Sequence, residues 1–239
     1  MTSCSNSVRR ARPLLGTYVE ITAFGAERTR LDQAIDRGFT AIETVHRLMS
    51  FQSPDSELSR LNQEGAQAPD TLHPWTAEVL SVAADLYQRS GGAFDATVGS
   101  GRRIDLSGIA KGFAVDRAVD ALRAAGVERG IVNAGGDLAA FGAADVEVAV
   151  RDPSDPSRLS AMVTLRDQAF ASSGRIIDPS TGRPMPTIEG ASVRAPSCTI
   201  ADALTKVVGV SGEAALPVLR HYGADALLFR AGSMVPLEA

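Results

Sequence analysis

The segment Ile104–Phe113 brings together residue types that can bind an anionic ligand. Asp105 ends a predicted strand, Ser107 and Gly108 form a turn, and Lys111 falls in the first turn of the helix that follows. A lysine at this position faces the positive end of the helix dipole, so the helix gains no stability from it. A bound phosphate would reverse that effect, because helix N-termini and lysines both attract anions. The structural alternative is that Ser107 caps the helix and Lys111 is solvated.

Asp202 is a second candidate, because it falls at the beginning of a helix predicted over Thr199–Val208. Together with the hydroxyl of Thr205, about one turn later, its carboxylate could present oxygen atoms to a hard cation such as Mg²⁺. The alternative is an acidic residue that only complements the helix dipole.

Two glycine-rich stretches complete the set of candidates. In Gly91–Gly99, Asp95 stands among small residues, which would let a ligand approach the backbone closely. A capped loop is the alternative for this stretch. In Asn133–Asp137 a Gly-Gly-Asp turn follows a predicted strand, and this pattern is also ordinary hairpin chemistry.

Several common site patterns are absent from the sequence. It has no Walker A loop, no G-x-G-x-x-G fingerprint and no G-x-S-x-G elbow. The histidines His46, His73 and His221 are scattered without the spacing of metal ligands, and His46 is expected to be structural.

The composition is that of an ordinary globular protein. The 239 residues are 44% hydrophobic and 22% charged, with a formal net charge of -4 and a pI of about 5.4. This acidic balance, with only 5% aromatic residues, argues against a nucleic-acid partner. Cys4 and Cys198 are too few for a disulfide framework and are expected to be free thiols. The sequence shows no apolar leader and no run of about 18 apolar residues, so we expect no membrane span and a cytoplasmic protein.

The elements that must position these residues follow from the hydrophobic spacing. Helices are expected over Glu27–Met49, Ser56–Asn62, Pro74–Gly91, Gly108–Ala125, Thr199–Val208 and Gly212–His221. Strands are expected over Thr17–Phe24, Gly130–Asn133, Leu138–Phe141, Val146–Arg151, Ala161–Leu165, Ser192–Ala195 and, last in the chain, Ala226–Phe229. Helices that cluster early and strands that cluster in the middle favour an α+β fold over βαβ alternation.

The segment Ala171–Pro184 contains a strong turn signal. In Asp178–Gly182 the aspartate opens a type I turn, Pro179 presets φ and Gly182 accepts a left-handed exit. These residues alone favour a hairpin tip over the wall of a ligand site.

Taken together, these stretches resemble the ApbE family, the FAD:protein FMN transferases. The matching segments occur in the family's order: Leu15–Thr17, Met49–Ser50 with Ser56–Asn62, Gly92–Gly99, Asp105–Gly112, Val132–Asp137, Ile177–Pro184 and Ala201–Leu204. The resemblance implies one ApbE-like domain over residues 13–239, with mixed or antiparallel sheets and packed helices, after a flexible tail of residues 1–12. It also implies transfer of FMN from FAD to a threonine hydroxyl of a flavoprotein partner, with Mg²⁺ and release of AMP.

The same resemblance implies roles for individual residues. Asp202 and Lys111 would act in catalysis. The Gly108 carbonyl, the Asp202 carboxylate and Thr205 would hold the metal. The residues that would line the FAD site are Leu15, Ala93, Phe94, Asp95, Asp105, Lys111 and Ile177.

The chain departs from the family pattern in three places. Gly99 and Asp105 are separated by a short stretch, Ser-Gly-Arg-Arg-Ile, where relatives carry a longer segment. Arg175 occupies the place of a family histidine, beside a missing insertion, and Lys206 stands where the family has a threonine. On a helix Thr205 points about 100° away from Lys206, so Thr205 would miss the metal while Lys206 would bring a cation there.

These departures leave two alternatives to transferase activity open. One is a flavin-nucleotide-binding protein, or a partner-binding protein, that kept the fold and lost the chemistry. The other is a short enzyme that acts on a different substrate.

Overall fold

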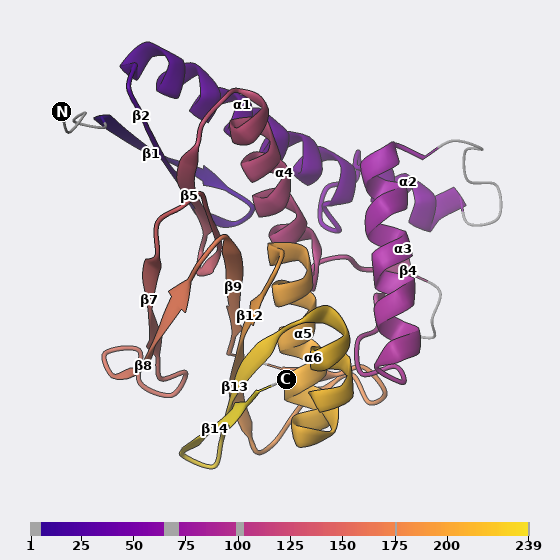
Figure 1. The fold of residues 1–239 in the computed structure, drawn as a ribbon. Helices are drawn as coiled ribbons and strands as arrows, with labels where there is room; N and C mark the ends of the chain where they lie inside the picture. The colour runs from indigo at the N-terminus through magenta and orange to yellow at the C-terminus, as the bar shows by residue number, and fades with distance from the viewer. Residues whose placement is uncertain (1–5, 65–71, 99–102, 175, 239) are drawn as a thin grey trace.

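An antiparallel sheet forms the centre of the protein (Figure 1). The computed structural model describes residues 6–64, 72–98, 103–174 and 176–238. The eight strands of the main sheet in these ranges are, in spatial order, β1 (Asn6–Leu14), β2 (Thr17–Gly25), β5 (Arg129–Ala134), β6 (Asp137–Phe141), β9 (Gln168–Ser173), β12 (Ile188–Ala195), β13 (Asp225–Arg230) and β14 (Ser233–Leu237). The two-stranded ribbons outside it are β3 (Thr97–Val98) with β4 (Arg103–Ile104), β7 (Val146–Arg151) with β8 (Leu159–Leu165), and β10 (Ile177–Asp178) with β11 (Arg183–Pro184).

Helices cover one face of the main sheet, and the β7–β8 ribbon lies on the other (Figure 1). The helices are α1 (Arg28–Met49), α2 (Glu57–Glu64), α3 (Pro74–Arg89), α4 (Ala110–Ala124), α5 (Cys198–Ser211) and α6 (Leu216–Tyr222). Helices α1, α4 and α5 pack on the sheet, while α2 and α3 lie farther out beside α1. This mixture of helices and antiparallel sheet in one domain confirms the predicted α+β fold.

The predicted long helix is confirmed as α1, because its apolar residues fall on one side. Leu31, Ile35, Phe39, Ile42 and Val45 are all buried. Their spacing of three or four residues places them along one face of the helix. This apolar face packs against the core and is removed from water.

Strand β6 shows why the apolar run Leu138–Phe141 forms a fully buried strand. The helical layer covers one of its faces, and the β7–β8 ribbon covers the other. Leu138 and Phe170 form a second apolar cluster there with Val150 and Leu165 of the ribbon. A strand that is buried on both faces needs no polar alternation.

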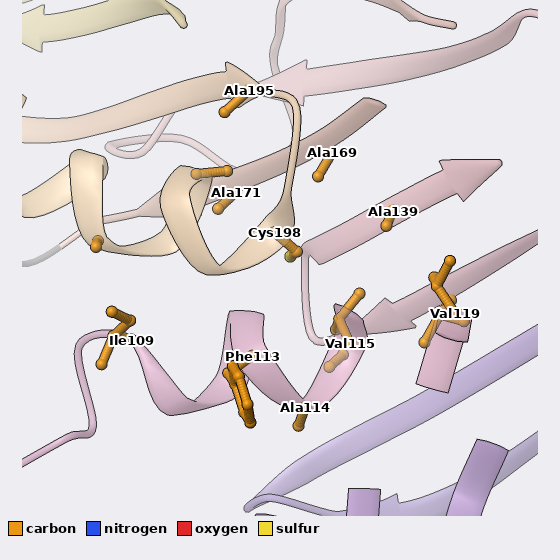
Figure 2. Packing of buried hydrophobic residues seen from close by; sticks show 14 of the residues in the cluster. Ile109, Phe113, Ala114, Val115, Val119, Ala139, Ala169, Ala171, Ala195 and Cys198 are labelled. Atoms are coloured by element: carbon orange, nitrogen blue, oxygen red, sulfur yellow. The ribbon is translucent and has the colours of Figure 1, made fainter. Parts of the chain in front are cut away.

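Helices α4 and α5 approach each other closely at Gly112 (Figure 2). A Cβ atom added to Gly112 would lie 2.2 Å from the carbonyl oxygen of Cys198 and 2.8 Å from Cβ of Asp202. Figure 2 shows Ile109 and Phe113 near the start of α4 and Cys198 at the start of the facing helix α5. The absence of a side chain at Gly112 therefore sets the distance between the two helices that carry Lys111 and Asp202.

The N-terminal residues differ from the flexible tail that the sequence predicts. Residues 6–12, expected in a flexible tail, lie in β1, which pairs with β2 in continuous antiparallel register. Arg10 of this strand also pairs with Asp32 of α1 at 2.7 Å. A strand held by its neighbour and by distant ion pairs needs no amphipathic pattern of its own. Residues 1–5, which include Cys4, lie outside the described residues, whereas Cys198 is a buried free thiol as predicted.

The helices and strands of the C-terminal region differ in part from those predicted from the sequence. The helix predicted over Gly212–His221 is a 3₁₀ turn over Gly212–Ala215 followed by α6, because Pro217 enters the first turn of a new helix. The strand predicted over Ala226–Phe229 is confirmed as β13, but β14 follows it. Of the described helices, none is long and apolar enough to cross a bilayer.

Candidate functional site

Two cavities lie beside the turn before α4, and Ser107 lines both of them. The first, of about 500 Å³, is called the acidic cavity here, because Asp95 and Asp105 line it together with Phe94, Ile177 and Lys206. The second, of about 250 Å³, is called the apolar cavity. Its lining includes Leu15, Val45, Met49, Phe51 and Lys111. The larger volume is that of a small-molecule site.

Side chain to backbone hydrogen bonds fix the wall that carries Asp105. Asn62 of α2 binds Ile104 on both sides of its backbone: its amide nitrogen donates to the carbonyl oxygen at 2.8 Å, and its amide oxygen accepts from the N–H at 2.7 Å. The Asp105 carboxylate then accepts from the N–H of Ser107 at 2.9 Å. The turn is thus held in place from outside the segment.

The β10–β11 ribbon supplies the opposite wall of the acidic cavity. The predicted turn Asp178–Gly182 is confirmed: the N–H of Gly182 donates to the carbonyl of Asp178 at 2.8 Å, and Gly182 has φ +67°. Ile176 is buried against Gly209 of α5, while the next residue, Ile177, faces the cavity and is 42% exposed. An exposed isoleucine at a cavity rim is the kind of surface that an apolar ligand group covers.

Lys111 forms an ion pair with Asp137, the first residue of β6. The Nζ atom lies 2.6 Å from Oδ2 of Asp137, whose side chain is 1% exposed. Burial, and then repulsion from Asp202, raise the pKa of Asp137 to about 6 against the opposing attraction of Lys111. Burial alone would lower the pKa of Lys111, but the carboxylates of Asp137 and Asp202 outweigh it and keep that pKa above its usual value. Lys111 is therefore a cation, and its side chain forms part of the wall of the apolar cavity.

Asp202 lies on α5 behind the acidic cavity and is 1% exposed. Its Oδ2 atom accepts the N–H of Gly112 at 3.0 Å, so this carboxylate satisfies a backbone donor in the first turn of α4. Its Oδ1 atom is paired with Nζ of Lys206, one turn farther along α5. Lys206 also donates to the carbonyl oxygen of Asp202 at 3.0 Å. Both carboxylate oxygens are thus engaged, one by a backbone group and one by an ammonium.

The residues expected to hold a metal do not form an oxygen cradle. Thr205 is completely buried, and its hydroxyl donates to the backbone carbonyl of Asp202 at 2.7 Å, not toward the cavity. Gly108 does line the acidic cavity, but the aliphatic part of Lys206 runs past it. Among the described residues there is no group of three or more His, Cys, Asp or Glu that could hold a metal ion. A divalent cation at Asp202 would have to displace the ammonium of Lys206, so the residues present do not fit Mg²⁺.

A second buried aspartate lies about one turn after Gly112 on α4. Asp116 of α4 accepts the N–H groups of Cys198 and Thr199 at 2.8 Å each, and the Thr199 hydroxyl at 2.5 Å. Burial raises the pKa of Asp116 against these hydrogen bonds. Each helix therefore supplies the acid that caps the other, and this arrangement fixes the relative position of Lys111 and Asp202.

The structure brings most of the predicted site residues together. Ala93, Phe94, Asp95, Asp105, Gly108 and Ile177 line the acidic cavity, and Leu15 and Lys111 line the apolar cavity. Asp202 and Thr205 lie behind these walls. Ser107 does not cap α4 with its side chain, and Lys111 is not simply solvated, so the structural alternative for that segment is wrong.

Sequence reasoning missed the roles of Asp137, Asn62 and Asp116. Asp137 and Asn62 stand in segments that were singled out, but their partners, Lys111 and Ile104, are distant in sequence. Asp116 carries no local signal, because it caps a helix 82 residues away. His46, expected to be only structural, is exposed and lines the apolar cavity. Arg175 and residues 99–102 lie outside the described residues.

Comparison with known proteins links this chain to one family. The family model described as "ApbE family" matches residues 15–103 and 99–228. A FAD:protein FMN transferase of Treponema pallidum is 26% identical over 312 aligned positions that cover 94% of this chain and 86% of the relative. That alignment is longer than the 239 residues of this chain, so the relative carries insertions that the chain lacks. A FAD:protein FMN transferase of Vibrio cholerae is 28% identical and covers 87% and 83% of the two chains.

Solved structures show the same fold. A mutant of the flavin transferase ApbE from Vibrio cholerae superposes with a TM-score of 0.80 at 25% identity, covering 97% of both chains. The ApbE protein of Thermotoga maritima has a TM-score of 0.86 at 21% identity, covering 98% of this chain and 97% of that one.

Proposed function

The chain belongs to the ApbE family, and we propose that it transfers FMN from FAD to a threonine hydroxyl of a flavoprotein partner and releases AMP. The observation that carries this proposal is the pair of neighbouring cavities that share Ser107 in their linings, each bordered by a lysine. A dinucleotide has two ring systems joined by a doubly negative pyrophosphate. Two neighbouring cavities that each have a lysine in their lining match that shape and charge.

The proposed reaction breaks the pyrophosphate bond of FAD. The acceptor hydroxyl attacks the phosphorus of the FMN half, the P–O bond to the AMP half breaks, AMP leaves with that oxygen, and the hydroxyl proton is released to water. Phosphoryl transfer depends mainly on positioning and on neutralising the phosphate oxygens. Lys206 in the acidic cavity and Lys111 in the apolar cavity are the side chains proposed for that neutralisation. Asp95 and Asp105 offer acceptors for the hydroxyl or ring N–H groups of the nucleotide.

Asp202 takes a different part in this proposal from the one that the resemblance implied. Both of its oxygens are engaged within the protein, so it acts as a positioning residue that holds Lys206 and the first turn of α4. Gly108 is proposed to contact the nucleotide through its backbone. The transfer contains no step through a resident Mg²⁺, because the donor set around Asp202 does not fit it.

A transfer assay tests the proposal. Purified protein is incubated with FAD and a flavoprotein acceptor that offers a threonine, with and without Mg²⁺. AMP release is followed by chromatography and covalent flavin by in-gel fluorescence. The proposal expects both products in equal amounts, and an acceptor whose threonine is replaced by valine gives neither. AMP without protein-bound flavin would instead identify a pyrophosphatase.

A second candidate function is flavin-nucleotide binding without transfer. It is favoured by Lys206 in place of a threonine and by the missing insertions relative to the Treponema pallidum protein. The same assay separates the two functions, because a binding protein releases unmodified FAD on denaturation and forms no AMP.

A further inference from the structure

The chain has only two lysines, Lys111 and Lys206, and both border the candidate site. Its other basic side chains are arginines, including those that form the surface ion pairs with Asp32, Asp85 and Glu213. An ammonium differs from a guanidinium in being a compact point charge that can meet several oxygens from any direction. In this protein that group occurs only where the two cavities lie.

Lys206 is held so that its charge reaches the acidic cavity. Its side chain is 27% exposed, its Nζ atom is paired with Asp202, and Asp202 is in turn fixed by the N–H of Gly112. A Cβ atom added to Gly108 would lie 3.5 Å from Cε of Lys206, so the lysine follows the backbone of the turn that borders the cavity. The ammonium therefore has a fixed anchor on one side and a cavity on the other.

This placement conflicts with a divalent cation at the same point. The Asp202 carboxylate is the acidic group that would attract the metal, and its single negative charge is already balanced by Lys206. The Thr205 hydroxyl is turned into the helix backbone. A second cation within a few ångströms of the ammonium would be repelled strongly in this largely buried place.

We propose that Lys206, anchored by Asp202, is the resident cation of the site and binds the phosphate groups of the nucleotide without a divalent metal. The identity of the ligand as FAD rests on the proposed function. The exclusion of the metal rests only on Lys206, Asp202 and Thr205.

Two titrations of the purified full chain test the proposal. In the first, Mn²⁺ is the probe and is followed by electron paramagnetic resonance without nucleotide. The wild type is expected to show no Mn²⁺ site with a Kd below about 1 mM. Lys206→Thr is expected to gain such a site, and the further change Asp202→Asn is expected to remove it.

In the second titration, FAD is titrated in EDTA and in Mg²⁺. The wild-type Kd is expected to change less than about twofold, and Lys206→Thr to bind at least about tenfold more weakly in EDTA with recovery in Mg²⁺.

Arg230→Thr is the matched control, because it removes one positive charge from an ion pair with Glu213 and lies outside both cavities. It is expected to leave both titrations unchanged. Thermal unfolding by circular dichroism verifies that the variants are folded. If Lys206→Thr does not fold, the Mn²⁺ and FAD titrations of the wild type alone decide whether the site holds a divalent metal.

Three results would overturn the proposal. The first is a wild-type Mn²⁺ site that Asp202→Asn abolishes. The second is a wild-type FAD affinity that rises tenfold or more with Mg²⁺. The third is a folded Lys206→Thr protein that behaves as the wild type in both titrations. Absence of FAD binding in every condition would contradict the proposed function instead, and the Mn²⁺ titration would still decide between Lys206 and a metal.

Discussion

Asp116 and Asp202 are both buried acids that accept backbone N–H groups from the first turn of the opposite helix. They differ in what else they hold. Asp116 gives both oxygens to the first turn of α5, and nearby Arg117 pairs with Glu78 and Asp120. Asp202 gives one oxygen to α4 and the other to Lys206, which faces a cavity. The same capping device thus carries no lysine at Asp116, which lines a separate cavity of about 290 Å³, whereas at Asp202 it is coupled to Lys206 of the candidate ligand site.

Both capping contacts form only while α4 and α5 stay close together, and Gly112 permits that close approach. A substitution of Gly112 is therefore expected to lower the stability of the protein more than the other substitutions considered below. Gly112→Ala would place a Cβ atom 2.2 Å from the backbone of Cys198 and force the helices apart. We expect a loss of about 3 kcal/mol or more in the free energy of unfolding, measured by urea denaturation.

Gly108→Ala is the matched control for that variant. Its nearest neighbours would be side-chain atoms of Lys206 and Phe94 at 3.5 Å, an ordinary contact distance. The change is expected to cost less than about 0.5 kcal/mol. Equal stability of the two variants would contradict the close-approach argument.

The capping role of Asp116 is tested by Asp116→Ala, which leaves two N–H groups and one hydroxyl of α5 without their acceptor. Buried donors that lose their partner make this change cost about 2–3 kcal/mol in the free energy of unfolding. FAD affinity of the folded protein is expected to stay within about twofold. Asp120→Ala, on the exposed side of the same helix, serves as the control and should change stability by less than about 0.5 kcal/mol.

The pH dependence of stability tests the electrostatic coupling of Asp137 to Lys111 and Asp202. Its folded-state pKa of about 6 lies above the usual value of an aspartate, so the folded state holds its proton more tightly than the unfolded state. Stability from this group is present below about pH 4 and is lost as the pH rises toward 6. Relative to Asp137→Asn, the wild type should lose about 1–2 kcal/mol of unfolding free energy between pH 4.5 and 7 by urea denaturation, a range set by that shift. Parallel pH profiles for the two proteins would show that the raised pKa is wrong.

The fold and the site could be predicted from the sequence to different depths. Helix α1 was predictable because its core contacts follow from local spacing, and the direction of Thr205 relative to Lys206 followed from helix geometry alone. Residues 6–12 were not, because their strand depends on β2 and on Asp32 of α1.

Partners distant in sequence account for what was missed at the site. The segment of Lys111 predicted an anion, but the anion in the described structure is Asp137, which only the fold places at 2.6 Å. The capping role of Asp116 likewise exists only when α4 meets α5. Spacing within one segment can thus indicate that a charge needs a partner, while the partner itself is chosen by tertiary packing.

FAD titration of the purified wild type, Lys206→Met and Asp116→Ala proteins by flavin fluorescence tests the central claim most directly. The account predicts saturable one-to-one binding in the wild type at a Kd of tens of micromolar or below, a loss of about tenfold in Lys206→Met, and no change beyond about twofold in folded Asp116→Ala. Absence of saturable FAD binding in the wild type, or an equal loss in both variants, would contradict it.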